Sequence, residues 1–200
     1  MAKMGSSAST ETGSTASQIL DAAEGLVQER GFNGFSYADV ARELGVTKAA
    51  LHYHFSSKAE LGDALIERYA ERFLAALAVV DVDRSDARDK LRDYAQLYAD
   101  VFKDERMCLC GMLAADYATL PDPMRERVVR FFDDNEVWLA HVLDEGRKAG
   151  TIRFTGSARP VARTLIGGLE GAMLVSRPYH DVKRFRDAAD LLIRGLAVEG

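Results

Sequence analysis

A short stretch near the amino terminus carries three helix-start signals in close succession. Ser36 and Thr47 are each suited to cap a helix, and Ser57 with Glu60 forms the pattern of a capping box. Gly45 is suited to end the first of these helices. Helices that begin so close together leave no room for strands. Two short helices joined at a glycine turn predict a helix-turn-helix, a unit that binds duplex DNA.

The second helix of this motif is expected to present a small, cationic and aromatic face. At 100° per residue, one arc of the helix holds Lys48, Ala49, His52 and Tyr53. Such a face suits a major groove, where lysine reaches guanine acceptors, a methyl group touches thymine and tyrosine binds phosphate oxygens. Positions 45 to 59 contain no acidic residue, although the whole chain has a formal charge of −5. The sequence therefore predicts a local DNA-binding surface on an acidic protein.

The end of the motif resembles a known family. Gly31-Phe32 and the later segment Leu-His-Tyr-His-Phe-Ser-Ser-Lys-Ala-Glu-Leu are similar to the signature of the TetR family of bacterial transcriptional regulators. The usual family pattern is Leu-Tyr-Tyr-His-Phe followed by Lys-Ser-Lys-Glu-Glu-Leu, from which His52, Ser56 and Ala59 depart. The resemblance implies a dimeric regulator with an amino-terminal DNA-binding domain and a carboxy-terminal domain that binds a small-molecule effector and dimerises.

The DNA-binding residues are predicted from the motif and the resemblance together. The resemblance implies that His54 reaches a phosphate and that Lys58 contacts the DNA backbone. A helical wheel instead places His54 nearer the buried side of its helix. The full predicted set is Ser36, Tyr37, Thr47, Lys48, Ala49, His52, Tyr53, His54 and Lys58.

The remaining sequence consists of helical patterns, with proline and glycine at the seams between them. Helices are expected near residues 57–80, 85–102, 107–119, 121–148, 157–176 and 182–197. With a first helix that ends at Gly31 and the two helices of the motif, the fold class is all-α with about nine helices. The expected division is a disordered amino-terminal arm over 1–14, the DNA-binding domain over 15–60, and the effector-binding and dimerisation domain over 61–200.

The penultimate helix has the pattern of a dimer interface. Apolar residues form a stripe beside glycines, which lack side chains and allow two helices to pack closely. Close packing within one subunit is the alternative. The predicted dimerisation residues are Leu165, Gly167, Gly168, Gly171 and Ala172. A two-fold dimer would place two recognition helices about 34 to 36 Å apart on a palindromic operator.

Aromatic and sulfur-containing side chains of the later helices are candidates for lining an effector pocket. Such a pocket would suit an apolar or aromatic small molecule. At helical spacing the same side chains are also ordinary core residues. The predicted effector-binding set is Tyr98, Phe102, Cys108, Met112, Tyr117, Phe131, Trp138 and Met173.

Cys108 has two possible roles. A position near a helix start beside Arg106 favours the thiolate, whereas Asp104 and Glu105 oppose it. The surrounding residues resemble those TetR regulators that carry a cysteine before this helix, some of which sense electrophiles or oxidants. A free cysteine is also an ordinary small core residue. A thiol sensor and an inert core cysteine both remain open.

Other classes of function lack their characteristic motifs. The chain has no Gly-rich phosphate loop, no His-Glu-x-x-His and no Gly-x-Ser-x-Gly, so no enzyme activity, catalytic residue or cofactor is expected. His52 and His54 face different ways on a helix, so no metal site is expected. No apolar run reaches the roughly 18 residues of a membrane span. The two cysteines, Cys108 and Cys110, fit a reducing cytoplasm.

The predicted function is a one-component transcriptional repressor that binds a palindromic DNA operator as a homodimer and is released by a small-molecule effector. Repression rather than activation is implied by the resemblance alone. A thiol-based redox or electrophile sensor of the same fold is one alternative. A ligand-binding helical dimer that does not bind DNA is the other.

Overall fold

The computed structural model describes residues 14–198, and within them the chain forms nine α-helices and two short 3-10 helices. The all-α prediction is confirmed. One isolated antiparallel bridge, between Ile152 and Ala197, joins the loop after α7 to the segment after α9. Of the predicted arm over 1–14, all but Ser14 lies outside the described residues. Ser14 itself caps the first helix, because its hydroxyl accepts from the Ser17 N–H at 3.3 Å.

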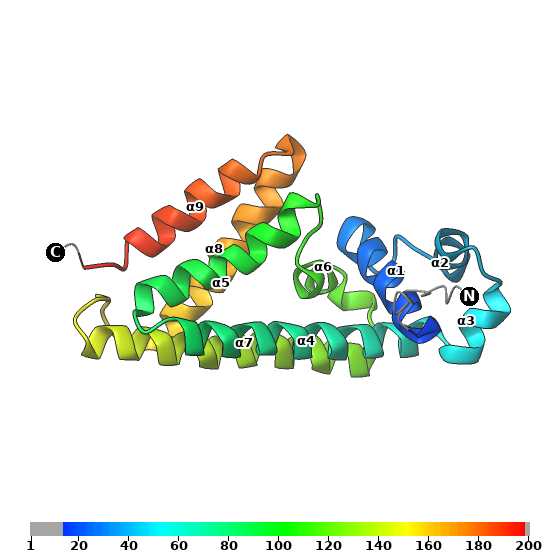
Figure 1. Cartoon of the computed structure of the whole chain (residues 1–200), viewed down its shortest axis with the longest axis horizontal. Helices are drawn as coiled ribbons and strands as arrows, with labels where there is room; N and C mark the ends of the chain where they lie inside the picture. Colours follow the sequence, from blue (N-terminus) through cyan, green and yellow to red (C-terminus); the bar gives the residue numbers. More distant parts are fainter. Residues whose placement is uncertain (1–13, 199–200) are drawn as a thin grey trace, which may run out of the picture.

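The first three helices form a small head at one end of the molecule (Figure 1). They are α1 (Thr15–Arg30), α2 (Tyr37–Leu44) and α3 (Lys48–His54). Both helices of the motif begin at the predicted caps, where Ser36 forms a capping box with Asp39 and Thr47 accepts from the Ala50 N–H at 3.3 Å. Gly45 ends α2 in the left-handed region, with φ +67°.

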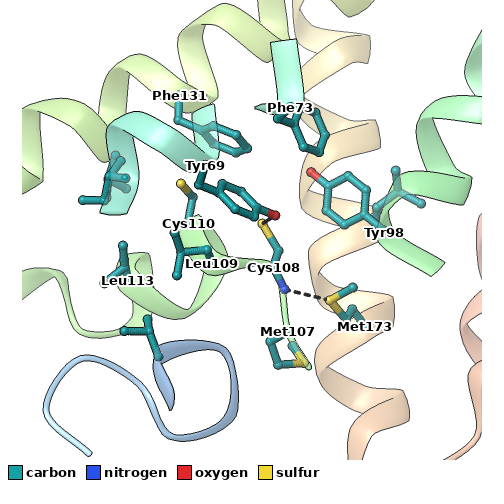
Figure 2. Close-up of a cluster of buried hydrophobic side chains, with 14 of the residues drawn as sticks. Tyr69, Phe73, Tyr98, Met107, Cys108, Leu109, Cys110, Leu113, Phe131 and Met173 are labelled. Carbon is teal, nitrogen blue, oxygen red and sulfur yellow. Dashed lines mark hydrogen bonds between the residues drawn. The ribbon is translucent and has the colours of Figure 1, made fainter. Parts of the chain in front are cut away.

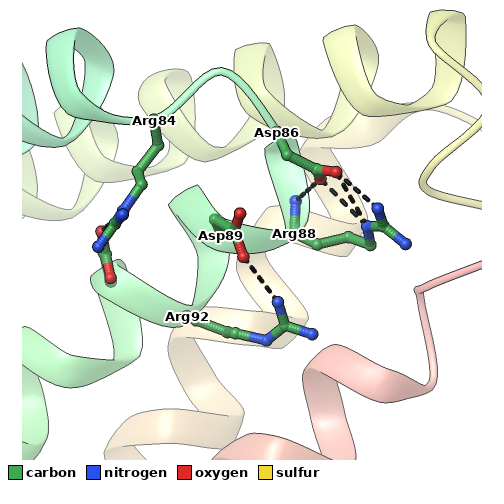
Figure 3. Close-up of polar contacts among 6 residues, drawn as sticks. Arg84, Asp86, Arg88, Asp89 and Arg92 are labelled. Carbon is green, nitrogen blue, oxygen red and sulfur yellow. Dashed lines mark hydrogen bonds and ion pairs between the residues drawn. The ribbon is translucent and has the colours of Figure 1, made fainter.

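A long helix, α4 (Lys58–Asp83), leaves the head and runs along the body beside α7 (Asp122–Lys148), as Figure 1 shows. The polar corner after α4 turns the chain back into α5 (Ala87–Lys103). There Arg84 Nε donates to Asp93 at 2.6 Å, and the Asp86 carboxylate caps α5 by accepting from the Arg88 N–H at 2.8 Å (Figure 3). A local charge pair and a helix cap therefore stabilise the corner between α4 and α5.

The body is completed by α6 (Leu109–Ala115), α8 (Ala158–Ser176) and α9 (Val182–Arg194), with α8 packed against both α7 and α9. The single helix predicted near 107–119 is instead α6 followed by a separate 3-10 turn, η1 (Tyr117–Thr119). The break falls at Asp116, whose carboxylate is turned toward the head. A second 3-10 turn, η2 (Arg177–Tyr179), joins α8 to α9.

One hydrophobic core runs from the head into the body. Leu51 on α3 and Leu61 at the start of α4 are fully buried, as their helical positions predict. Farther along α4, the Phe73 ring lies 5.3 Å from the Phe131 ring and 6.1 Å from the Tyr98 ring, measured between centroids. This aromatic packing joins α4, α5 and α7 in the interior of the body.

Candidate DNA interface and effector site

The outer face of α3 carries the side chains that the helical wheel assigns to it. Lys48, Ala49, His52 and Tyr53 are exposed, and Tyr53 is 86% exposed. Leu51, on the opposite side, is fully buried and anchors α3 to the head. A large aromatic side chain left in water on an anchored helix is suited to contact a partner. That this partner is DNA remains a prediction.

The two histidines of α3 have different environments. His52 is exposed, and its Nδ1 is 3.1 Å from the Ser56 carbonyl, to which it donates when that nitrogen carries the proton. His54 is half-buried, with its ring 5.2 Å from the Tyr53 ring in an edge-on arrangement. The half-buried position of His54 therefore agrees fully with neither prediction. The resemblance implies a side chain that reaches a phosphate, whereas the helical wheel implies a side chain on the buried face of α3.

Two residues predicted to bind DNA at the start of α2 have structural roles instead. The Tyr37 hydroxyl is buried and donates to the Phe55 carbonyl at 2.9 Å, and burial raises the pKa of this phenol to about 12. This bond ties α2 to the residue that ends α3, so the expectation of a DNA contact from Tyr37 is corrected. Ser36 is exposed, but its hydroxyl donates to Asp39 at 2.7 Å within the capping box.

Lys58 is also not a free cation. Its ammonium donates to the Phe35 carbonyl at 2.6 Å and to the Phe32 carbonyl, and it lies 4.3 and 4.5 Å from the centroids of these two rings. Burial lowers the pKa of this ammonium, against the opposing charges of Asp116 and Asp39. In this conformation the ammonium is directed into the head, and the predicted contact with the DNA backbone stays a prediction. Lys58 braces the loop between α1 and α2, because two of the three N–H donors of its ammonium are used inside the head.

The body holds the end of α1 through contacts that the sequence reasoning missed. Asp116 accepts from the backbone N–H of Phe32 at 2.7 Å and of Asn33 at 3.3 Å. The Met107 N–H donates to the Gln28 carbonyl at 3.2 Å. Gly31 is the sequence feature that could have indicated this contact, because it adopts φ +79° and a Cβ built there would lie 2.8 Å from Asp116 Oδ2. The residues that flank α6 therefore form hydrogen bonds with the backbone of the head on both sides of Gly31.

Four of the predicted effector-binding residues gather in the interior of the body: Tyr98, Cys108, Phe131 and Met173. Figure 2 shows them around Tyr69 of α4. The Cys108 N–H donates to the Met173 sulfur at 3.2 Å, and the Tyr69 hydroxyl donates to the Cys108 sulfur at 3.7 Å. Sulfur and aromatic groups from α4, α5, α7, α8 and the start of α6 thus meet at one place.

The other four predicted effector residues lie elsewhere. Tyr117 is exposed on η1, where the Arg125 guanidinium stacks 5.6 Å from its ring, so its expected place in an interior pocket is corrected. Half-buried Trp138 stacks on Tyr94 at 5.7 Å, and half-buried Met112 accepts from Arg177 at 3.8 Å. Phe102 lines a separate cavity of about 410 Å³ that opens between the ends of α1 and α5 and the start of α9.

Both cysteines are buried, and this decides their reactivity. Burial and then the nearby Glu170 carboxyl raise the pKa of the Cys108 thiol well above its usual range, and the same two causes act on Cys110. Arg106 is turned toward α1, because a Cβ built on Gly25 would lie 3.2 Å from its Nη2. The helix-start and arginine effects that favoured a thiolate are thus outweighed. The structure contradicts a reactive Cys108 in this conformation.

Glu170 of α8 is a further residue that the sequence reasoning missed. Its side-chain oxygen Oε1 is buried and has no hydrogen-bond partner among the described residues. Burial raises the pKa of this carboxyl to about 7, although the nearby Cys108 thiol acts in the opposite direction. A glutamate in a helical pattern reads as a solvated residue, so the sequence offers no local signal for this burial.

The glycines of α8 divide into two kinds. A Cβ built on Gly168 would lie 2.8 Å from Leu192 Cδ1, so Gly168 provides close packing between α8 and α9 of one subunit. A Cβ on Gly167 or Gly171 would meet nothing within 4 Å. Leu165 and Ala172 are buried within the subunit, which corrects their predicted place at a dimer interface.

Apolar side chains remain exposed on the same two helices. Leu174 and Val175 of α8 are 59% and 62% exposed, and Leu191 of α9 is 69% exposed. Together with the open glycine positions, they form a surface on α8 and α9 that nothing in the described subunit covers.

The described part of the chain contains neither a metal-binding cluster nor a helix that could span a membrane. Among residues 14–198, no group of three or more His, Cys, Asp or Glu side chains is arranged to hold a metal ion. Within that same part of the chain, no helix has the length and apolar character that crossing a membrane requires.

Comparisons with known proteins agree with this architecture. The family model of tetR bacterial regulatory proteins matches residues 19–65, and that of the tetracyclin repressor-like C-terminal domain matches residues 87–192. The chain is 32% identical over 142 residues to the HTH-type transcriptional regulator CymR of Pseudomonas putida, covering 66% of this chain and 67% of that protein. It is 33% identical over 129 residues to the nucleoid occlusion factor SlmA of Marinobacter nauticus, covering 64% of this chain and 66% of that protein.

Solved structures give the same picture. A tetR-family transcriptional regulator from Agrobacterium tumefaciens superposes with a TM-score of 0.88 at 30% identity, covering 92% of this chain and 97% of that one. A TetR regulator from Legionella pneumophila gives 0.83 at 27% identity, covering 93% and 99%.

Proposed function

This chain belongs to the tetR family of bacterial regulatory proteins and is a transcriptional regulator with a DNA-binding helix-turn-helix domain; on that premise we propose that it acts in the cytoplasm as a homodimeric repressor. In this proposal the dimer binds a palindromic operator, and a small-molecule effector bound in the body releases it. The observation that carries the proposal is the exposed face of α3.

That face combines the features that groove recognition needs. Lys48 supplies a cation, Ala49 a small methyl group and Tyr53 an exposed ring with a hydroxyl. The helix is held in place from behind by buried Leu51 and by the bond from Tyr37 to Phe55. A rigid scaffold that presents polar and aromatic groups binds with less loss of conformational entropy than a mobile one.

The uncovered surface of α8 and α9 supports the homodimer. Exposed Leu174, Val175 and Leu191 lie on these helices, and Gly167 and Gly171 leave room for a second helix to approach. Antiparallel helices from two copies would form a four-helix interface around a two-fold axis. Two heads related by that axis require a palindromic operator with half-sites about one DNA turn apart.

The contacts between the body and the head support control by an effector. Asp116, Met107 and Arg177 bind backbone atoms on either side of the end of α1, so a shift of α6 moves the head. An effector that favours the DNA-incompetent arrangement by roughly 2 to 3 kcal/mol would weaken operator affinity about 30- to 150-fold.

Selection from a random double-stranded DNA library tests DNA recognition for an operator of any sequence. The wild-type protein is expected to enrich a two-fold symmetric motif, and the Lys48→Ala, Tyr53→Ala double variant is expected to lose that enrichment while remaining folded and dimeric. The proposal fails if wild type and double variant recover the same unrelated sequences. That result would favour a ligand-binding helical dimer that does not bind DNA.

A further inference from the structure

Glu170 places a carboxyl group inside the body without a compensating cation. The side chain is half-buried, and its Oε1 is enclosed and has no hydrogen-bond partner among the described residues. No basic side chain of residues 14–198 forms an ion pair with it. An ionised carboxylate in such a position is unfavourable unless a positive group pairs with it. In the ligand-free protein, the Glu170 carboxylate therefore lacks a cationic partner.

The backbone of α6 makes the room in which this carboxyl lies. Gly111 faces it directly, because a Cβ built on Gly111 would lie 2.8 Å from Glu170 Cδ. Any side chain at position 111 would push the carboxyl group away. The Glu170 side chain of α8 therefore occupies the space that the missing side chain of Gly111 leaves beside α6.

The groups around the carboxyl are neutral near pH 7. Tyr69 of α4, Tyr94 and Tyr98 of α5, and Cys108 and Cys110 at the start of α6 all respond to the charge of Glu170. Burial raises the pKa of each of these five groups well above its usual range. Glu170 is therefore the member of this cluster that changes charge near neutral pH.

Aromatic rings lie next to the same cluster. Figure 2 shows Tyr69, Phe73, Tyr98 and Phe131 around the Cys108 sulfur, and the Glu170 carboxyl is near enough to Cys108 to raise the pKa of this thiol further, after burial itself. The face of an aromatic ring attracts a cation, and its apolar carbon atoms accommodate an aromatic or aliphatic body. The Glu170 carboxylate and the aromatic rings therefore favour the same kind of molecule, a cation with an aromatic or aliphatic skeleton.

We infer that Glu170 anchors an effector subsite for a protonated amine carried on an aromatic or apolar body. The inference rests on the proposed function, since it names the chemical class of the effector that the body binds. In the bound state, the ligand's ammonium N–H donates to the free Oε1 and neutralises the buried charge. The aromatic rings of α4, α5 and α7 contact the apolar part of the ligand. A neutral or anionic ligand would leave the carboxylate unpaired.

The inference predicts a pH dependence of affinity. Burial raises the pKa of Glu170 to about 7, so the carboxyl is mainly protonated at pH 5.5 and mainly ionised at pH 8. Between these values the ionised fraction rises roughly 30-fold, while an alkylamine stays protonated. Affinity for the amine should therefore rise with pH, whereas affinity for a neutral analogue should stay constant.

Matched pairs of probes test the charge requirement. Arylalkylamines are compared with the alcohol of the same skeleton, beginning with 2-phenylethylamine against 2-phenylethanol and tryptamine against tryptophol. Thermal shift and calorimetric titration measure binding to the wild-type dimer at pH 5.5 and pH 8. At least one amine is expected to bind at least tenfold more tightly than its alcohol at pH 8, with the preference lost at pH 5.5. The inference is overturned if no amine is preferred over its alcohol.

Three variants assign the effect to Glu170. Glu170→Gln is expected to remove both the amine preference and its pH dependence. Gly111→Ala keeps the Glu170 carboxyl but displaces it, so this variant is expected to weaken amine binding. Glu71→Gln changes an exposed carboxylate on α4 and should behave as wild type. If Glu170→Gln does not fold, Gly111→Ala and the wild-type pH profile still decide. An amine preference that survives in both site variants also rejects the inference.

The outcome is separable from that of the proposed function. If the dimer binds its selected operator but no amine is preferred over its alcohol, the regulator proposal stands and the amine site is rejected. If amines bind through Glu170 but no DNA motif is enriched, the amine site stands and the regulator proposal is rejected.

Discussion

The Asp116 carboxylate accepts a hydrogen bond from the Phe32 backbone N–H at 2.7 Å, although 84 positions separate the two residues in the chain. The same oxygen accepts from the Asn33 N–H at 3.3 Å. This contact joins the end of α6 in the body to the loop that leads into α2 in the head. In the proposed mechanism, this direct bond is the route by which a change in the position of α6 reaches the DNA-binding helices.

Replacing Asp116 by alanine should destabilise the protein and weaken the link between the body and the head. The partly buried Phe32 N–H would lose its partner, which costs about 1 to 3 kcal/mol. Urea unfolding measures this loss, and Asp187→Ala, at an exposed carboxylate of α9, should change stability by less than about 0.5 kcal/mol. Equal midpoints for the two variants would show that the contact contributes nothing.

Lys48 and Lys58 should give opposite results when each is replaced by alanine. Lys48→Ala should reduce operator affinity roughly 5- to 150-fold and lower the salt dependence, with unfolding unchanged, because the side chain is exposed on α3. Lys58→Ala should lower the unfolding midpoint, because two carbonyls of the loop lose their donor. Lys148→Ala, at the end of α7, is the control for total charge. A stable Lys58→Ala protein with a reduced salt slope would return Lys58 to the DNA interface.

Leucine at three glycines of α8 distinguishes the dimer surface from the subunit core. A Cβ at Gly167 or Gly171 has no neighbouring atom of the subunit within 4 Å, so Gly167→Leu and Gly171→Leu should give folded monomers by light scattering. Gly168→Leu collides with Leu192 and should lower thermal stability instead. Dimers of native stability from both of the first two variants would place the interface elsewhere.

Glu170 should make the protein less stable as pH rises from about 5 to 8. Burial raises the pKa of this carboxyl from its ordinary 4.5 to about 7, so over this range the folded protein binds a proton that the unfolded chain has lost. Because the folded state holds more protons, the free energy of unfolding falls with rising pH, by about 3 kcal/mol in total.

Urea unfolding at pH 5 and pH 8 checks this sign. Glu170→Gln should remove the decrease that Glu170 causes, and Glu71→Gln should retain it. The same pH dependence in wild type and Glu170→Gln would mean that the carboxyl is not buried as described.

The sequence by itself determined the helices of the head and the outward face of α3. Ser36, Thr47 and Gly45 act on backbone atoms only a few residues away, so their effects can be read from neighbouring positions. The exposure of Tyr53 and the burial of Leu51 follow from the angle between successive residues of a helix. The family signature lies in this same local segment, which is why both fold class and family could be predicted.

Only the tertiary structure decided what the charged and reactive residues of the chain do. Lys58 reads as a free cation until the Phe32 and Phe35 carbonyls are placed around it. The sequence leaves open whether Cys108 is a reactive thiol or an inert core residue, until α4 and α8 enclose it and burial raises its pKa. Burial and electrostatic interaction depend on distances to groups that are remote in the chain, and a sequence pattern contains no such distances. Helix caps are local, whereas the environment of Glu170 arises only when α6 and α8 pack together.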